Sequence, residues 1–114
     1  MRILLDECLP RPLAGLLTGH TVKTVRQMRW QGQQNGELLA LVCRHFDAFL
    51  TVDQSLPHQQ NLKRLKIALL ILKTRSNKLE DILPHLPEIL VTLRHVKPGQ
   101  VRRIPAPTPE TPRP

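Results

Sequence analysis

The sequence predicts an α/β fold in which strands and helices alternate around a mainly parallel sheet. Short apolar runs alternate with segments of helical periodicity, as in βαβ units. Residues 67–72 are continuously apolar, as expected of a central strand that is covered on both faces. Two further apolar runs each end in an aspartate, at Asp6 and Asp53. Because the carboxyl ends of parallel strands meet at one edge of a sheet, we expect these two side chains to lie close together.

The first part of the chain predicts a strand, a helix and a second strand. Residues 3–5 form the first strand. Pro10 suits the first turn of the helix that follows, and Gly19 ends that helix. The apolar face of the helix carries Leu13, Leu16 and Leu17. Residues 21–25 are rich in β-branched side chains and alternate between apolar and polar, which predicts the second strand.

The middle of the chain predicts two helices, each followed by a strand. Asn35 is a suitable N-cap, and Glu37 then lies in the first turn of the helix. One face of this helix carries Leu38, Leu39, Val42 and Phe46. Residues 48–52 predict the next strand, residues 57–65 a short helix, and residues 67–72 the central strand.

The last helical segment is predicted to begin at Asn77. Its side chain is suited to cap the helix, with Glu80 completing a capping box. Pro84 and Pro87 are expected to divide the stretch up to residue 95 into a one-turn piece and a longer helix, because proline inside a helix removes a hydrogen bond. Residues 101–104 then predict a final edge strand.

Length and composition favour one domain with an anionic partner. The chain has 114 residues, of which we expect 1–104 to form the domain and the proline-rich residues 105–114 a disordered or polyproline-like tail. Its 17 Lys and Arg against 9 Asp and Glu give a net charge of +8, which points to nucleic acid. No run reaches the roughly 18 apolar residues of a membrane span, and no signal peptide opens the chain, so we expect no membrane association and a cytoplasmic location. Cys8 and Cys43 lack zinc-site or disulfide spacing and are expected to be reduced.

The strongest candidate for chemistry is a trio of acids, Asp6, Glu37 and Asp53, from two strand ends and one helix start. Mg²⁺ and Mn²⁺ prefer oxygen ligands, and Mg²⁺ often takes only one or two carboxylates with phosphate oxygens completing its shell. Such a site suits phosphodiester cleavage, because the metal polarises the phosphoryl oxygen and activates a bound water.

Each acid also has a structural interpretation. Asp6 and Asp53 are both suited to cap the turn that follows their strand, although Thr51 adds a hydroxyl on the same face as Asp53. Glu37 is in the first turn of a helix, where the macrodipole favours acids whatever they bind. Asp47 is expected at the opposite end of its strand and is therefore not a candidate ligand.

Several motifs in order resemble the bacterial PIN-like family of short proteins. The motifs are RILLDECLP at 2–10, NGELL at 35–39, LTVD at 50–53, QQNL at 59–62 and RSNKLEDILP at 75–84. The resemblance covers about residues 1 to 104 and implies a three-layer α/β/α domain. It also implies a metal-dependent ribonuclease, of the kind that is often a toxin neutralised by an antitoxin protein. In this comparison Asp6, Glu37 and Asp53 match the catalytic acids.

One departure from active PIN nucleases leaves a second function open. Those enzymes usually carry a fourth acid shortly after the third, whereas this chain has Ser55 there, and three carboxylates would hold a second metal poorly. The alternative is a PIN-like module without efficient catalysis that binds RNA or a protein partner. Gln60 and Asn61 are candidate neutral ligands or RNA contacts, or else polar residues of a helix surface.

Basic side chains supply the candidate RNA contacts. Lys73 and Arg75 are the best placed, because they follow the strand at 67–72 and would emerge at the same edge as the acids. The other candidates are Arg11, Arg26, Arg29, Lys63, Arg64, Lys78, Arg102 and Arg103, more than half of which we expect to be solvated surface. Trp30 could stack on a base, but a lone aromatic is more often packed at a core margin. Since PIN-like domains often dimerise, residues 26–30 are also a candidate homodimer contact.

Overall fold

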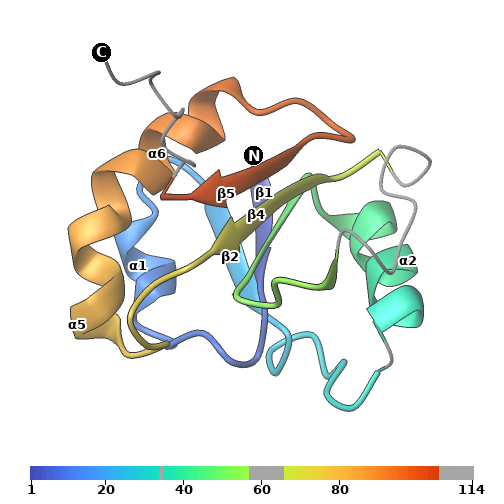
Figure 1. Ribbon diagram of the computed structural model, residues 1–114. Helices are drawn as coiled ribbons and strands as arrows, with labels where there is room; N and C mark the ends of the chain where they lie inside the picture. Colours follow the sequence, from blue (N-terminus) through green and yellow to red (C-terminus); the bar gives the residue numbers. More distant parts are fainter. Residues whose placement is uncertain (34, 57–65, 106–114) are drawn as a thin grey trace.

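The computed structural model describes residues 1–33, 35–56 and 66–105, except for the side chain at position 35. Five strands and the helices between them alternate along the chain (Figure 1). The strands are β1 (Arg2–Leu5), β2 (Thr21–Thr24), β3 (Ala48–Thr51), β4 (Ala68–Leu72) and β5 (Val101–Ile104). The helices are α1 (Leu13–Leu16), α2 (Asn35–His45), α5 (Leu79–Ile82), the 3₁₀ turn η1 (Leu83–His85) and α6 (Leu86–His95).

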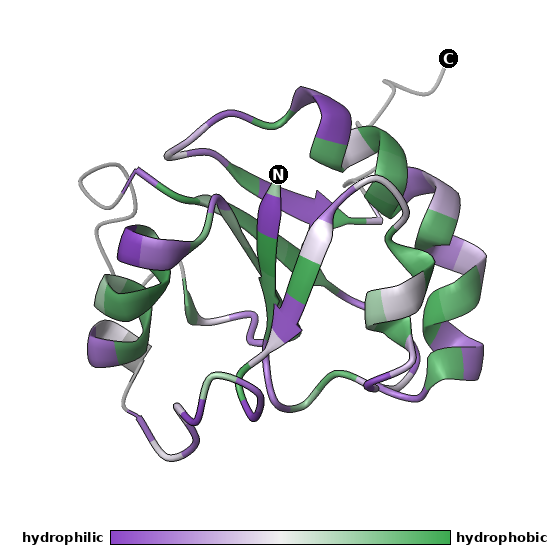
Figure 2. Cartoon of the chain, turned by 180° about the vertical axis from the view of Figure 1, so that it is seen from behind, coloured by the Kyte–Doolittle hydropathy of each residue, from purple (hydrophilic) through white to green (hydrophobic). Residues whose placement is uncertain are grey.

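All five strands are parallel and lie in the order β2-β1-β3-β4-β5. The three central strands are almost entirely buried, and β4 is buried at every position, which explains its continuous run of apolar residues. The edge strand β2 instead alternates in hydropathy along its length (Figure 2). The predicted α/β fold with a mainly parallel sheet is confirmed.

Apolar side chains form two clusters on opposite faces of the sheet. Residues that alternate along β4 belong to different clusters, Leu70 to one and Leu69 to the other, because successive side chains of a strand point to opposite faces. The first cluster includes buried residues of α1, α5 and α6, and the second includes those of α2, as the arrangement in Figure 1 also shows. The predicted apolar face of α2, Leu38, Leu39, Val42 and Phe46, is buried as expected.

Two helix starts differ from the predictions. α1 is a single turn that begins only at Leu13, after its N-cap Pro12, because a proline disfavours the helical conformation of the residue before it. The capping box at Asn77 is wrong: Lys78 is the N-cap of α5, and the Asn77 side chain donates to the carbonyl oxygen of Cys8 at 2.8 Å. Ser76 instead accepts the Lys78 N–H and donates to the carboxylate of Asp81.

The predicted effect of the two prolines is confirmed. Pro84 lies in the 3₁₀ turn η1, and Pro87 is in the first turn of α6, so the segment divides into α5, η1 and α6. The predicted helix at 57–65 and the tail at 106–114 lie outside the described residues. Among the described helices, none is long and apolar enough to cross a membrane.

Candidate functional site

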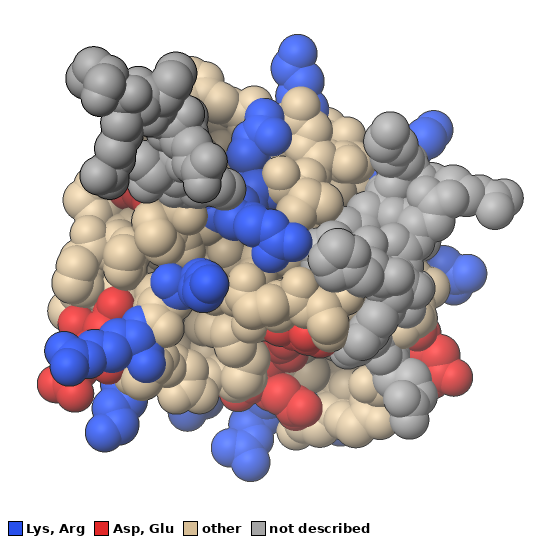
Figure 3. All heavy atoms as spheres, in the orientation of Figure 1, with Lys and Arg blue, Asp and Glu red and all other residues tan. Residues whose placement is uncertain are grey.

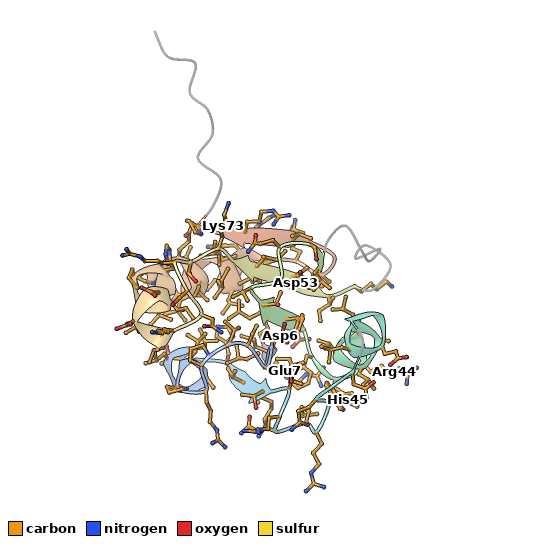
Figure 4. The ribbon with its side chains drawn as sticks, turned by 60° about the horizontal axis from the view of Figure 1, so that its bottom comes forward. Asp6, Glu7, Arg44, His45, Asp53 and Lys73 are labelled. Atoms are coloured by element: carbon orange, nitrogen blue, oxygen red, sulfur yellow. The ribbon has the colours of Figure 1, made fainter. Side chains whose placement is uncertain are left out.

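The carboxyl edge of the sheet brings Asp6 and Asp53 to the ends of neighbouring strands. Asp6 directly follows β1, and its backbone N–H donates to the carbonyl oxygen of Leu50 in β3 at 2.9 Å, which extends the ladder by one residue. Asp53 follows β3 after one intervening residue. Both side chains are half-buried, and Figure 4 shows them beside each other at this edge.

A buried hydroxyl connects the two aspartates. The Thr51 side chain is fully buried, and its Oγ1 donates to Asp6 Oδ2 at 2.6 Å. The same oxygen accepts the backbone N–H of Asp53 at 3.1 Å. The second carboxylate oxygen of Asp6, Oδ1, accepts the backbone N–H of Glu7 at 2.8 Å. Thr51 therefore holds the Asp6 carboxylate in one orientation and ties it to the backbone that carries Asp53.

Ser55 holds the carboxylate of Asp53 by two hydrogen bonds. Its backbone N–H and its hydroxyl both donate to Asp53 Oδ1, at 3.0 and 2.7 Å. The spacing Asp-x-Ser is typical of a turn in which an aspartate side chain accepts hydrogen bonds from the residue two positions on. Ser55 thus orients the carboxylate of Asp53 and adds no charge of its own.

The side chain of Gln54 connects the ends of three strands at the same edge by hydrogen bonds. Its side-chain amide donates to the carbonyl oxygens of Val52 and Leu72, at 3.2 and 2.9 Å. Its side-chain oxygen accepts from the Arg103 guanidinium at 3.3 Å. The segment that carries Asp53 is therefore fixed to the ends of β4 and β5.

Glu37 does not join the two aspartates to form a metal site in this structure. It lies in the first turn of α2 and is exposed. In the described part of the chain, no group of three or more His, Cys, Asp or Glu side chains is placed to hold a metal ion. Asp6 and Asp53 alone still suit Mg²⁺ or Mn²⁺ with substrate oxygens completing the shell, but they do not suit a cage of protein ligands only.

A cavity of about 450 Å³ opens next to Asp6, on the side away from Asp53. Its wall contains Arg11 and Arg26, and both side chains are exposed. The remaining lining residues are Asp6, Glu7, Leu9, Thr24 and Gln31. The cavity is thus lined by both basic side chains and one of the two aspartates, Asp6.

The loop that carries Arg26 is held in place by local bonds. Thr24 and Gln27 exchange two hydrogen bonds, in which each backbone N–H donates to the other side chain, at 2.9 and 3.1 Å. Trp30 packs its ring edge-on against Phe46 with ring centroids 5.9 Å apart, so it lies at a core margin as the more common alternative predicted. The pattern Thr-x-x-Gln was a signal for this turn that the sequence analysis missed.

Of the predicted basic contacts, Arg11 and Arg26 line the cavity on one side of the aspartates, and Lys73 follows β4 on the other side. Lys63 and Arg64 lie outside the described residues. Lys73 directly follows β4 and is exposed, and Arg75 is exposed two residues further on. Figure 4 shows Lys73, Asp53, Asp6 and Glu7 in that order across the carboxyl edge. Further Lys and Arg side chains gather over the edge strand β5 (Figure 3). Gln60 and Asn61 lie outside the described residues.

The thiol of Cys8 is affected by the negative charge of Asp6 at this edge. Burial raises the pKa of its thiol, and the negative charge of Asp6 raises that pKa further. Burial alone raises the pKa of Cys43, which packs against the second apolar cluster. The two cysteines are not joined by a disulfide.

Comparison with known proteins assigns neither a family nor a function to the chain. No protein-family model, curated protein or solved structure gives a significant match to the chain. The chemistry of the carboxyl edge therefore has to be argued from its own residues.

Proposed function

We propose that the protein is a metal-dependent ribonuclease of the PIN-like type, with its active site at Asp6 and Asp53. The observation that carries the proposal is the hydroxyl of Thr51, which links the two aspartates from within the sheet. A buried side chain that orients a carboxylate at the carboxyl edge of a parallel sheet is typical of a prepared site. The net charge of +8 favours a polyanionic substrate.

Each residue of the site has a role in this proposal. Asp6 and Asp53 would hold one Mg²⁺ or Mn²⁺, which supplies a polarised phosphoryl oxygen and a water of lowered pKa when it is bound. Thr51 and Ser55 keep the two carboxylates oriented before substrate arrives. Lys73 contributes a positive charge for the phosphates of RNA, without sequence preference.

The same surface suits a toxin that is controlled by an antitoxin protein. The aspartates and the basic side chains lie together at one exposed edge, so a single partner that covers this edge would block access of RNA. The cytoplasm, where RNA and such a partner meet, is the location that this proposal requires. A small reading frame beside the gene, whose product binds the protein and stops cleavage, is the expected partner.

The test is cleavage of single-stranded and hairpin RNA with Mn²⁺, with Mg²⁺ and with chelator. Wild-type protein should cut only with metal, and the double variant Asp6→Asn, Asp53→Asn should not cut. Asparagine keeps an oxygen acceptor at both positions. Circular dichroism and thermal unfolding of the double variant should therefore show an intact fold. Equal cleavage by pure wild type and double variant would refute the proposal.

A second candidate is a module that binds RNA or a protein without cutting RNA. It is favoured by the position of Glu37, which leaves the described residues without a group of three metal-ligating side chains. In that case RNA should bind equally well with chelator and with Mn²⁺ and should stay intact. Loss of binding on chelation, together with cleavage in Mn²⁺, would exclude this candidate.

A further inference from the structure

We infer that the cavity beside Asp6 binds one nucleotide of the substrate RNA, next to the position of cleavage, and favours a base with an exocyclic amino group. The inference rests on the proposed function, because it places the cavity beside the scissile phosphate. Cavities of roughly 300 to 1000 Å³ are the usual size of small-molecule sites, and this one has about 450 Å³. It is therefore large enough for a nucleotide unit.

The strand order gives the cavity its place along the substrate. Thr24 ends β2 and Asp6 follows β1, so the cavity opens where these two neighbouring strands end. Asp53 follows β3 on the other side of β1, and Lys73 follows β4 beyond it. Neighbouring strands lie about 4.8 Å apart, so a chain lying across this edge passes from Lys73 to the two aspartates and then to the cavity.

The two arginines of the cavity point to a phosphate as one part of the ligand. A guanidinium binds phosphate oxygens with two parallel N–H donors, and Arg11 and Arg26 come from different segments of the wall. Within the described part of the chain, neither arginine forms a salt bridge with a protein carboxylate. Both are therefore available for an anion from outside.

The remaining lining residues suit a base. Leu9 lines the cavity and is 7% exposed, so it offers a small apolar contact to the ring. Glu7 is an acceptor only, and the Gln31 amide both donates and accepts. An acidic side chain accepts a hydrogen bond from the amino group of cytosine, whereas uracil presents a carbonyl oxygen in its place. We therefore expect cytidine to bind better than uridine.

The wall that carries Arg26 and Gln31 is preformed. The reciprocal bonds between Thr24 and Gln27 and the packing of Trp30 on Phe46 fix the loop without any ligand. The backbone of Val25 also donates to the carbonyl oxygen of Leu5 in β1 at 3.1 Å. A preformed wall loses little freedom on binding, which favours affinity for a ligand as small as one nucleotide.

The experiment is a titration of cytidine 5′-monophosphate, followed by NMR shifts, in chelator so that no metal contributes. Wild-type protein should bind it, with shifts in Leu9, Thr24 and Gln31, and should bind uridine 5′-monophosphate about tenfold more weakly. The variant Arg11→Gln, Arg26→Gln should lose at least tenfold in affinity. Arg44→Gln removes an arginine of α2 that is also exposed and lies away from this row (Figure 4), and this variant should bind as wild type does.

Three outcomes would overturn the inference. They are equal binding to wild type and to the double arginine variant, binding of inorganic phosphate as tight as that of the nucleotide, and equal affinity for the two nucleotides. The variant Asp53→Asn separates this inference from the proposed function, because Asp53 is not part of the cavity wall. It should lose RNA cleavage and keep nucleotide binding. Binding without any cleavage by wild type would refute the ribonuclease and leave the cavity as a nucleotide site.

Discussion

One aspartate lies at each end of the strands β1 and β3, and the two have different partners. Asp47 precedes β3 at the amino edge of the sheet, and Asp6 follows β1 at the carboxyl edge. At the amino edge, Asp47 Oδ2 accepts the backbone N–H of Arg2 at 2.7 Å and lies 3.7 Å from the Arg2 guanidinium Nε. At the carboxyl edge, Asp6 is bound by a neutral hydroxyl and a backbone N–H. Within the described residues, no cation lies at salt-bridge distance from Asp6.

This difference separates an aspartate that pairs with an internal cation from one that is oriented by neutral donors only. Asp47 also joins the strands through its backbone, donating to Arg2 and accepting from Ala68. Its side chain completes that connection with an internal partner. Asp6 has its orientation fixed by Thr51 and forms no salt bridge with a described cation, which is the condition expected of a ligand for an external cation.

Neutralising each aspartate in turn is expected to have the largest effect. Asp6→Asn should lower RNA cleavage by about 100-fold or more, the scale of losing one group that stabilises charge in a transition state. Asp47→Asn should leave cleavage unchanged. The measurement is the rate of cleavage of one RNA substrate in Mn²⁺ by both variants. Equal losses in the two variants would show that the edges do not differ in function.

Removal of the buried hydroxyl tests whether the carboxyl edge is preorganised. Thr51→Val keeps the shape of the side chain but removes the donor to Asp6 and the acceptor for the Asp53 N–H. We expect the free energy of unfolding to fall by about 2 kcal/mol, because a hydrogen bond to a charged group is lost in a buried place. Urea unfolding measures this change, and Thr51→Ser should restore most of the stability. If the valine variant were as stable as wild type, the hydrogen bonds of Thr51 to Asp6 and Asp53 would not stabilise the fold.

Loss of the ion pair at the amino edge should have a smaller effect. The side chains of Arg2 and Asp47 are 58% and 46% exposed, and solvent screens a pair of this kind. Arg2→Gln should therefore lower the free energy of unfolding by no more than about 1 kcal/mol. Because the pair is screened by salt, this difference should shrink between low and high ionic strength in urea unfolding. A larger, salt-independent loss would show that the pair stabilises the edge more strongly than its exposure indicates.

The smallest expected effect is on the reactivity of Cys8. Burial and the charge of Asp6 both raise the pKa of this thiol, so little thiolate is present at pH 8. Asp6→Asn removes the charge, which lowers that pKa and should speed alkylation by iodoacetamide. Cys43 is the internal control, since burial alone raises its pKa. Mass spectrometry of the two peptides measures both rates. An unchanged rate at Cys8 would mean that its thiol does not sense the charge of Asp6.

The strands, most of the helices and the aspartates at the strand ends follow from the amino-acid sequence alone. Hydrophobic periodicity decides these features, because each depends on residues a few positions apart: the run at 67–72 is β4, and the face with Leu38 and Val42 is buried. Pro84 and Pro87 divided the last helical segment as predicted, since loss of an N–H acts locally. The expected cap at Asn77 was wrong because that side chain finds a partner 69 positions away, at Cys8.

Which polar groups contact one another depends on how the strands and loops pack in three dimensions. The strand order places Thr51 against Asp6, 45 positions apart, and brings Arg11 and Arg26 to one cavity. It also leaves Glu37 outside a group of three ligands in the described part of the chain, although its place at a helix start was predicted. The physical reason is that strand pairing and loop packing join segments that are distant in sequence, and local periodicity carries no information about which distant side chain completes a hydrogen bond.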